Sequence, residues 1–357
     1  MRLLRALLPM LAIAGCATRV PPMTARADVE AAPPACRTRV TGVRWIAPEP
    51  ARDRSRLDRW CAATGPPVVL APSPGSIHPP AELVVVSWNL QVGAADLDAL
   101  IGRLRDGAFS DGQPVRRFVL LLQEGHRGGA DVPTMLTAAA QVPRPIRPAN
   151  RPPDNDLMAV ARRQQLALFY VPSMRNGAPS ATEEDRGNAI LSTEPLTGLT
   201  AIELPFERQR RVAVAATIDL AGAGGREPLR LVSLHLEAVS SAKVLWLFGR
   251  ARPRQIGALL AALPAAGALV VGGDFNTWFG HADLTYRRMA KALPDVVATD
   301  RRPTFALRRR LDHVFARLPA GWTAADQRLD QRFGSDHHPV LVQLRGPGGG
   351  ARQPARY

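Results

Sequence analysis

The sequence predicts an α/β domain in which two β-sheets pack face to face with helices outside them. Many short apolar runs, each long enough for one buried strand, follow one another along the chain, and stripes at helical spacing occur between only some of them. Strand runs are expected at 83–88, 118–122, 166–171, 189–192, 212–218, 229–234, 268–271, 311–315 and 340–344. Helices are expected at about 97–104, 252–263 and 283–293. Strands so numerous, with so few helices between them, indicate two packed sheets.

Composition and charge narrow the class of protein. The chain has 357 residues, of which 22% are charged and 46% hydrophobic, so it can bury a sizeable core. Its net charge of +15 suits a polyanionic partner, such as nucleic acid or an anionic lipid surface. The alternative is a solvated basic surface without such a role, because Lys243 and Lys291 are the only lysines and a GC-rich genome would favour arginine.

The N-terminus has the pattern of a targeting segment. Arg2 and Arg5 precede an apolar stretch at 6–14 that is too short to span a bilayer. The segment 1–16 ends at Cys16 and resembles a bacterial lipoprotein signal, in which that cysteine is lipidated. The alternative is an ordinary secretory signal with an incidental cysteine. Either reading predicts export, and the lipoprotein reading predicts anchoring to the bacterial cell envelope, on its periplasmic or outer-membrane face.

Residues 17–82 are rich in proline, alanine and arginine, and we expect a tether between the anchor and the domain. Cys36 and Cys61 remain as an even pair in an oxidising compartment, so a disulfide between them is expected, with two free buried thiols as the alternative. The domain is expected at 83–344, and a disordered tail at 345–357.

Polar side chains gather where the apolar runs stop. Asp274 and Asn276 follow the run at 268–271, and strand alternation would direct both to one face. The residues in comparable positions are Asn89, Glu124, His235, Asp274, Asn276, Asp312, Asp336 and His337. If these strand ends converge, one sheet edge carries oxygen ligands for a hard divalent cation, a base for water and a proton donor. This set meets the requirements of phosphate ester hydrolysis.

The order of these motifs resembles the endonuclease/exonuclease/phosphatase superfamily. The motifs are Ser87-Trp88-Asn89, Gln123-Glu124, Gly187 to Ser192, Ser233-Leu234-His235, Gly272 to Asn276, Leu311 to Phe315 and Ser335 to Pro339, and they cover about residues 83–344. The resemblance implies a four-layer α/β sandwich of the deoxyribonuclease I type, with two mixed β-sheets flanked by helices. It also implies a metal-dependent phosphoesterase that uses Mg²⁺, with Mn²⁺ or Ca²⁺ as alternatives.

Roles carried over from the resemblance are assigned residue by residue. Glu124 resembles the principal metal ligand, with Asn89 and Asp336 beside it. Asp274 resembles the residue that orients or deprotonates the attacking water, and Asn276 one that holds the phosphate oxygen. His337 resembles the imidazole at the scissile phosphate, oriented by Asp312, and His235 the second imidazole of the nuclease and sphingomyelinase branches. Asn188 is a further candidate for phosphate contact.

One departure from the family pattern leaves the subtype open. No acidic partner for His235 follows Gln123-Glu124 directly, and Asp131, Asp154 and Asp156 remain as candidates. The apolar run Val244 to Phe248, followed by arginines, suits either a lipid interface or a buried helical turn, and the arginines suit a nucleic-acid backbone. Nucleic acid is therefore the first expected substrate. A sphingomyelin or phospholipid headgroup ester and a small phosphate ester are alternatives, and a non-catalytic binding lipoprotein is the alternative from another class.

Overall fold

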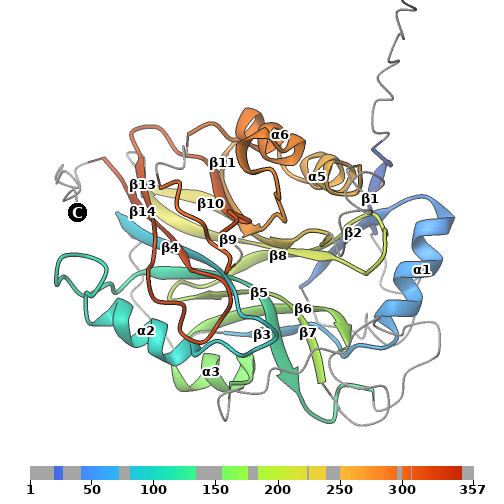
Figure 1. The fold of residues 1–357 in the computed structure, drawn as a ribbon, viewed down its shortest axis with the longest axis horizontal. Helices are drawn as coiled ribbons and strands as arrows, with labels where there is room; N and C mark the ends of the chain where they lie inside the picture. Colours follow the sequence, from blue (N-terminus) through green and yellow to red (C-terminus); the bar gives the residue numbers. More distant parts are fainter. Residues whose placement is uncertain are drawn as a thin grey trace, which may run out of the picture.

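Two mixed β-sheets pack face to face, and helices cover their outer faces (Figure 1). The computed structural model describes residues 20–26, 42–71, 81–133, 155–175, 184–222, 225–238, 250–295, 300–306 and 308–347. The first sheet has seven strands in the order β1 (Met23–Arg26), β2 (Arg44–Pro48), β8 (Thr197–Glu203), β9 (Val212–Gly222), β10 (Gly225–His235), β11 (Ala268–Asp274) and β12 (Asp312–Arg317). The second has seven in the order β13 (Thr323–Arg328), β14 (Val340–Arg345), β4 (Glu82–Asn89), β5 (Phe118–Gly128), β7 (Glu184–Ser192), β6 (Ala167–Arg175) and β3 (Val68–Leu70). The predicted four-layer sandwich is confirmed.

Helices form the two outer layers. The first sheet is covered by α5 (Ala251–Ala262) and α6 (Leu284–Ala292), and the second by α2 (Leu97–Arg105) and α3 (Leu157–Arg163). A short 3₁₀ turn, η3 (Gly280–Ala282), precedes α6. Aspartates begin three of the helices: the side chains of Asp96, Asp156 and Asp283 accept hydrogen bonds from the first free backbone amides of α2, α3 and α6. No helix in the described ranges is long and apolar enough to cross a membrane.

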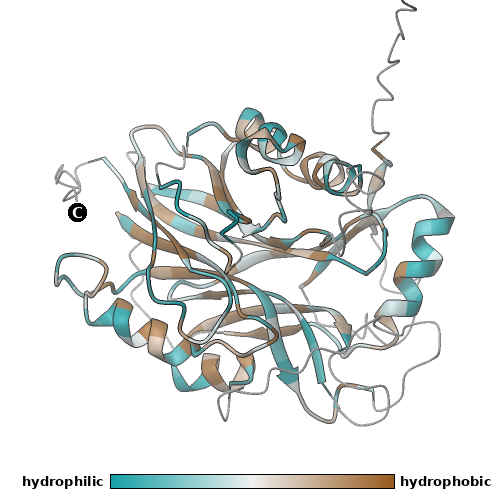
Figure 2. Cartoon of the chain, in the orientation of Figure 1, coloured by the Kyte–Doolittle hydropathy of each residue, from teal (hydrophilic) through white to brown (hydrophobic). Residues whose placement is uncertain are grey.

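The strands are nearly continuous apolar runs because both of their faces are buried. In β4, Val85 lies in the core between the sheets, while Val84 and Val86 lie in the core under α2 and α3. In β11, Val270 faces the central core, and its neighbour Val271 faces α5 and α6. Figure 2 shows the same distribution, with hydrophobic colours along the strands and mainly hydrophilic colours on α1 (Ala51–Cys61).

The expected tether at 17–82 is in part a folded piece of the domain, and the boundary at residue 83 was placed too late. β1 pairs with β2, and β2 joins the first sheet by pairing in parallel with β8. β3 joins the second sheet by pairing with β6. These strands are short and lie at or near sheet edges, where proline is tolerated and a long apolar period is absent, so local sequence patterns contain little signal for them.

Only one of the two cysteines of the expected disulfide belongs to the described residues. Cys61, the last residue of α1, is fully buried and disulfide-bonded, while its expected partner Cys36 lies outside the described residues. Cys16 and the signal segment 1–16 also lie outside them, as do residues 348–357 of the expected tail. The last strand, β14, ends at Arg345, close to the expected domain end.

A buried ion pair holds the N-terminal region against the second sheet. The Arg127 guanidinium donates to both carboxylate oxygens of Asp185, and the Tyr170 hydroxyl donates to Asp185 Oδ1 at 2.7 Å. Asp185 also accepts from the Gly65 amide at 2.8 Å, and Arg127 donates to the Pro66 carbonyl at 2.6 Å. One carboxylate therefore connects β5, β6 and β7 to the segment that leads into β3.

Asp185→Asn should destabilise the domain by about 3 kcal/mol, because it leaves the Arg127 charge buried without its carboxylate. Urea unfolding measured by circular dichroism provides the test. Asp219→Asn is the matched control, since Asp219 pairs with Arg226 on the surface, where both side chains are substantially exposed and the pair contributes little. Equal midpoints for both variants would contradict the structural role of Asp185.

Candidate active site

The candidate site lies where strands from both sheets end, at a point where the sheets approach each other closely. A Cβ atom at Gly272 in β11 would lie 2.8 Å from Leu121 Cδ1 and 3.1 Å from Ser87 Cβ, both in the opposite sheet. At Gly273 it would lie 2.0 Å from the Leu234 carbonyl oxygen. Polar bonds cross the same gap, since Gln123 Nε2 donates to Ser233 Oγ at 3.0 Å. Gly272 therefore permits the close packing of the two sheets, while Gly273 permits the close approach of β11 to its neighbour β10 in the same sheet.

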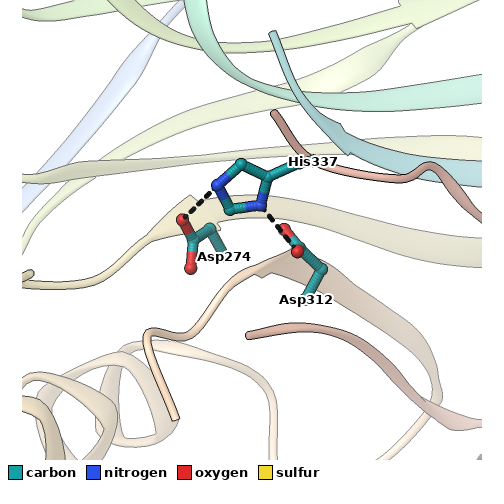
Figure 3. A group of neighbouring side chains, drawn as sticks. All are labelled: Asp274, Asp312 and His337. Carbon is teal, nitrogen blue, oxygen red and sulfur yellow. Dashed lines mark hydrogen bonds and ion pairs between the residues drawn. The ribbon is translucent and has the colours of Figure 1, made fainter. Parts of the chain in front are cut away.

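His337 is held by Asp312 and directed at Asp274 (Figure 3). His337 Nδ1 and Asp312 Oδ2 are 2.8 Å apart, and both side chains are almost completely buried. The Asp312 backbone amide donates to Thr304 Oγ1 at 3.1 Å, and the Phe305 ring lies 4.8 Å from the imidazole, centroid to centroid. Burial alone would lower the pKa of His337, but the charge and hydrogen bond of Asp312, together with Asp274 and Asp336, raise it to about 10. The imidazole is therefore a cation that donates from Nε2.

Asp274 receives contacts from four directions. Its Oδ2 accepts from Asn89 Nδ2 at 3.1 Å and lies 3.4 Å from His235 Nε2 and 3.8 Å from His337 Nε2. Its Oδ1 accepts from the Asn276 amide at 2.9 Å. Burial, followed by the nearby charge of Asp312, raises the pKa of Asp274 to about 7. A carboxylate with a pKa near neutrality can exchange a proton with water at physiological pH.

Glu124 and Asp336 form the more open, acidic side of the site. Glu124 follows the apolar part of β5 at an irregularity in its pairing with β7, and it adopts a left-handed backbone conformation with φ +53°. Side-chain exposure is 22% for Glu124 and 35% for Asp336, against 3% for Asp274. Burial, and then the charge of Glu124, raise the pKa of Asp336, although His337 opposes the shift. Such uncompensated negative charge fits a divalent cation.

Two groups of side chains could hold that cation. Ligand atoms of Asp274, Asp312 and His337 lie within 4.8 Å of one another. In this group, however, His337 Nδ1 already bonds to Asp312, and the raised pKa of the imidazole disfavours the neutral form that a metal ion requires. Glu124 and Asp336, beside Asn89, offer oxygen atoms that have better access to solvent. The donor set therefore fits a hard cation on the Glu124 side.

His235 is neutral in this environment. Burial, and then the charges of Arg211, His337 and Arg186, lower the pKa of its imidazole well below the usual value. Its Nδ1 lies 3.8 Å from Glu124 Oε1, so Glu124 and Asp274 are the carboxylates found next to it among the described residues.

The three acidic candidates proposed for His235 do not come together with it in the described structure. Asp156 caps α3 and also accepts from the Gly128 amide, and Asp131 is exposed. Asp154 lies outside the described residues, as does the apolar run Val244 to Phe248. Among the described residues, the carboxylates beside His235 are therefore Glu124 and Asp274, and a role for Asp154 stays a prediction.

Two of the three predicted site asparagines, Asn276 and Asn188, donate side-chain hydrogen bonds to backbone carbonyls. Asn276, with φ +51°, donates from Nδ2 to the Leu236 carbonyl at 3.2 Å. Asn188 donates from Nδ2 to the Val212 carbonyl at 2.6 Å and so joins β7 of one sheet to β9 of the other. Phosphate contact by either side chain stays a prediction.

Sequence reasoning missed several residues that surround the site. Thr304 and Phe305 contact the Asp312–His337 pair, and Arg186 and Arg211 place positive charge beside His235. The signal for Arg211 was the basic run that ends just before the strand at 212, but a local pattern does not show which strand ends are neighbours.

Comparison with known proteins agrees with this geometry. Residues 86–337 match the model of the Endonuclease/Exonuclease/phosphatase family. No curated protein sequence matches significantly. Among solved structures, an endonuclease/exonuclease/phosphatase from Beutenbergia cavernae has 21% identity and a TM-score of 0.53, covering 75% of this chain and 72% of that one.

Two further solved structures have lower scores. The human Nocturnin catalytic domain with bound sulfate has 19% identity and a TM-score of 0.48, with 78% and 96% coverage of the two chains. A family protein from Leptotrichia buccalis has 14% identity and a TM-score of 0.49, with 74% and 99% coverage.

The match extends over more than half of the chain, so the protein belongs to the endonuclease/exonuclease/phosphatase family. Members of this family are metal-dependent phosphoesterases, and the carboxylate and imidazole groups described above are consistent with that class. The chain is accordingly a divalent-metal-dependent phosphoesterase.

Asp274→Asn should stabilise the metal-free protein at neutral and alkaline pH while abolishing most activity. The folded-state pKa of about 7 exceeds the usual 3.8, so the folded wild type loses stability as pH rises from about 4 to about 7. Asparagine does not titrate. We therefore expect urea unfolding in EDTA to show a gain of about 1 kcal/mol or more at pH 8, and a smaller gain at pH 5. A loss of stability at pH 8 would contradict the proposed burial of this charge.

Proposed function

We propose that the protein hydrolyses phosphodiester bonds in nucleic acid, with Mg²⁺ as the preferred cation and Mn²⁺ or Ca²⁺ as alternatives. The observation that carries the proposal is the arrangement of His337 and Asp274. His337 has a raised pKa, is held by Asp312, and its Nε2 lies 3.8 Å from Oδ2 of Asp274, a carboxyl group whose pKa is close to neutrality. A proton donor and a proton acceptor that converge on one space, beside a cluster of carboxylates, fit the in-line attack of water on phosphorus.

Each side chain has a distinct task in this reaction. Asp274 takes the proton of the attacking water, and its orientation is fixed by Asn89 and the Asn276 amide. His337 donates a hydrogen bond from Nε2 to a phosphate oxygen and so stabilises the negative charge that develops there. His235, neutral and close to Asp274, orients the water or a second phosphate oxygen.

The cation would bind to Glu124, Asp336 and the Asn89 carboxamide. A divalent ion supplies Lewis-acid stabilisation of the phosphate and of the leaving oxygen. Its charge would also lower the raised pKa values of Asp274 and Asp336, which favours the basic form of Asp274 at neutral pH.

Nucleic acid is favoured as substrate by charge. The chain carries a net charge of +15, and two buried arginines, Arg186 and Arg211, act electrostatically on His235. Positive charge next to the catalytic centre suits a polyanion, whereas a phosphocholine headgroup would place its own cation there.

The test combines a substrate panel with Glu124→Gln. Wild-type protein with Mg²⁺ should cleave plasmid DNA or RNA, and Glu124→Gln should lower turnover at least about tenfold and shift the Mg²⁺ requirement upward, because one ligand charge is lost. Glu227→Gln, on an exposed part of β10, is the control.

Sphingomyelin micelles, phospholipid vesicles and a small phosphate monoester complete the panel. Hydrolysis of one of these without cleavage of nucleic acid would replace the nuclease proposal. Absence of any hydrolysis, together with tight nucleic-acid binding, would favour a non-catalytic binding lipoprotein.

We also propose that the protein acts outside the cytoplasm, anchored to the bacterial envelope through a lipid on Cys16. The signal-like segment 1–16 is the support for this location. In a bacterial host, Cys16→Ser should abolish incorporation of labelled fatty acid and release the protein from the membrane fraction, whereas Thr18→Ser should not. An unchanged lipidated mass in Cys16→Ser would overturn the proposal.

A further inference from the structure

Two arginines that enter the site from opposite sheets are buried beside the catalytic groups. Arg186 lies in β7 and is 6% exposed, and Arg211 directly precedes β9 and is 5% exposed. Guanidinium groups are costly to bury without a compensating anion. The charge of Glu124 acts favourably on Arg186, so it is the burial of Arg211 in particular that calls for a physical reason.

The strand pairing places both arginines at the catalytic end of the sandwich. β9 begins just after Arg211 and runs antiparallel to β10, which ends at His235. Arg186 is paired with His126 in β5, close to Glu124, and two positions before Asn188 on the same face of β7. The bond from Asn188 to the Val212 carbonyl ties β7 to β9 next to Arg211. The charges of Arg211 and Arg186 also act on each other and on His235.

Three other buried arginines among the described residues have carboxylate partners. Arg127 pairs with Asp185, Arg210 with Glu203 at 2.9 Å, and Arg252 with Asp283 at 3.1 Å. Arg211 differs from its neighbour Arg210, because its Nη2 donates to the neutral Gln209 side chain at 3.0 Å. Within the described part of the chain, no carboxylate pairs with Arg211, and its buried Nε has no hydrogen-bond partner. Arg210 and Arg252 also have an unpartnered Nε, so the feature that distinguishes Arg211 is a buried positive charge without a paired carboxylate, and such a charge favours the binding of an anion.

We propose that Arg186 and Arg211 form an anion subsite that binds a second phosphate of the substrate, next to the scissile phosphodiester. The proposal rests on the proposed nuclease function and specifies it: the preferred substrate is a phosphodiester flanked by another phosphate, as every internal linkage of a polynucleotide is. Two guanidiniums present several N–H donors to such a group, and a quaternary ammonium in the same place would be repelled. The subsite therefore selects against phosphocholine lipids.

The experiment compares dithymidine monophosphate with its 5′-phosphorylated and 3′-phosphorylated forms, which differ only in one additional phosphate. With Mg²⁺, wild-type kcat/KM should be at least about tenfold higher for one phosphorylated form, a difference of about 1.4 kcal/mol. In Arg211→Gln and in Arg186→Gln this preference should fall to about threefold or less, and Arg211→Lys should retain part of it. Arg226→Gln, at the far end of β10, is the control and should keep the full preference.

Binding measured by calorimetry in EDTA separates the subsite from the catalytic reaction. The phosphorylated dinucleotide should bind wild type more tightly than the unphosphorylated one, and Arg211→Gln should remove the difference. If wild type cleaves neither dinucleotide but binds them with this arginine-dependent difference, the nuclease proposal fails while the anion subsite stands. If wild type shows no preference in either assay, or if the preference survives both glutamine variants, the subsite is refuted. The wild-type comparison decides the matter even if a variant fails to fold.

Discussion

The close approach of the two sheets at Gly272 is the constraint on which the site depends. Only glycine allows β11 to lie against Ser87 and Leu121 of the opposite sheet, and the Gln123–Ser233 bond fixes the same junction. Strands of the two sheets that meet here bring Asn89, Glu124, His235 and Asp274 into one space. Sheet packing thus positions these four side chains, while Asp336 and His337 lie in the segment between β13 and β14.

The site concentrates charge that the fold leaves uncompensated. Burial raises the pKa of Asp274 and Asp336 and lowers that of His235. At His337, the neighbouring aspartates outweigh the effect of burial and raise the pKa. Several buried charges elsewhere among the described residues are paired, as at Arg127 and Asp185. This contrast separates functional from structural polar residues. At the site, a metal ion and a phosphate would supply the missing countercharges, whereas the paired structural residues need none.

Part of the N-terminal region belongs to the folded domain. Short strands from residues 23–70 extend both sheets, and Asp185 ties this region to β5 and β6. A chain anchored at Cys16 would therefore lead into the domain through folded structure along part of its length, with less free tether between membrane and active site than the proline-rich composition indicated.

The sequence by itself determined the two-sheet architecture and the helices outside the sheets, and it predicted the polar side chains of the site, because apolar runs followed by Asn89, Glu124 or Asp274 form a local pattern. Tertiary structure alone decided what lies beside these residues. The neighbours of His235, the pairing of His337 with Asp312, and the convergence of Arg186 with Arg211 depend on which strand ends meet across the sandwich. The edge strands β1, β2 and β3 were also decided by pairing, since segments so short have no periodicity of their own. Local hydrophobic patterns fix which face of a strand is buried, but charge compensation is set by neighbours distant in sequence.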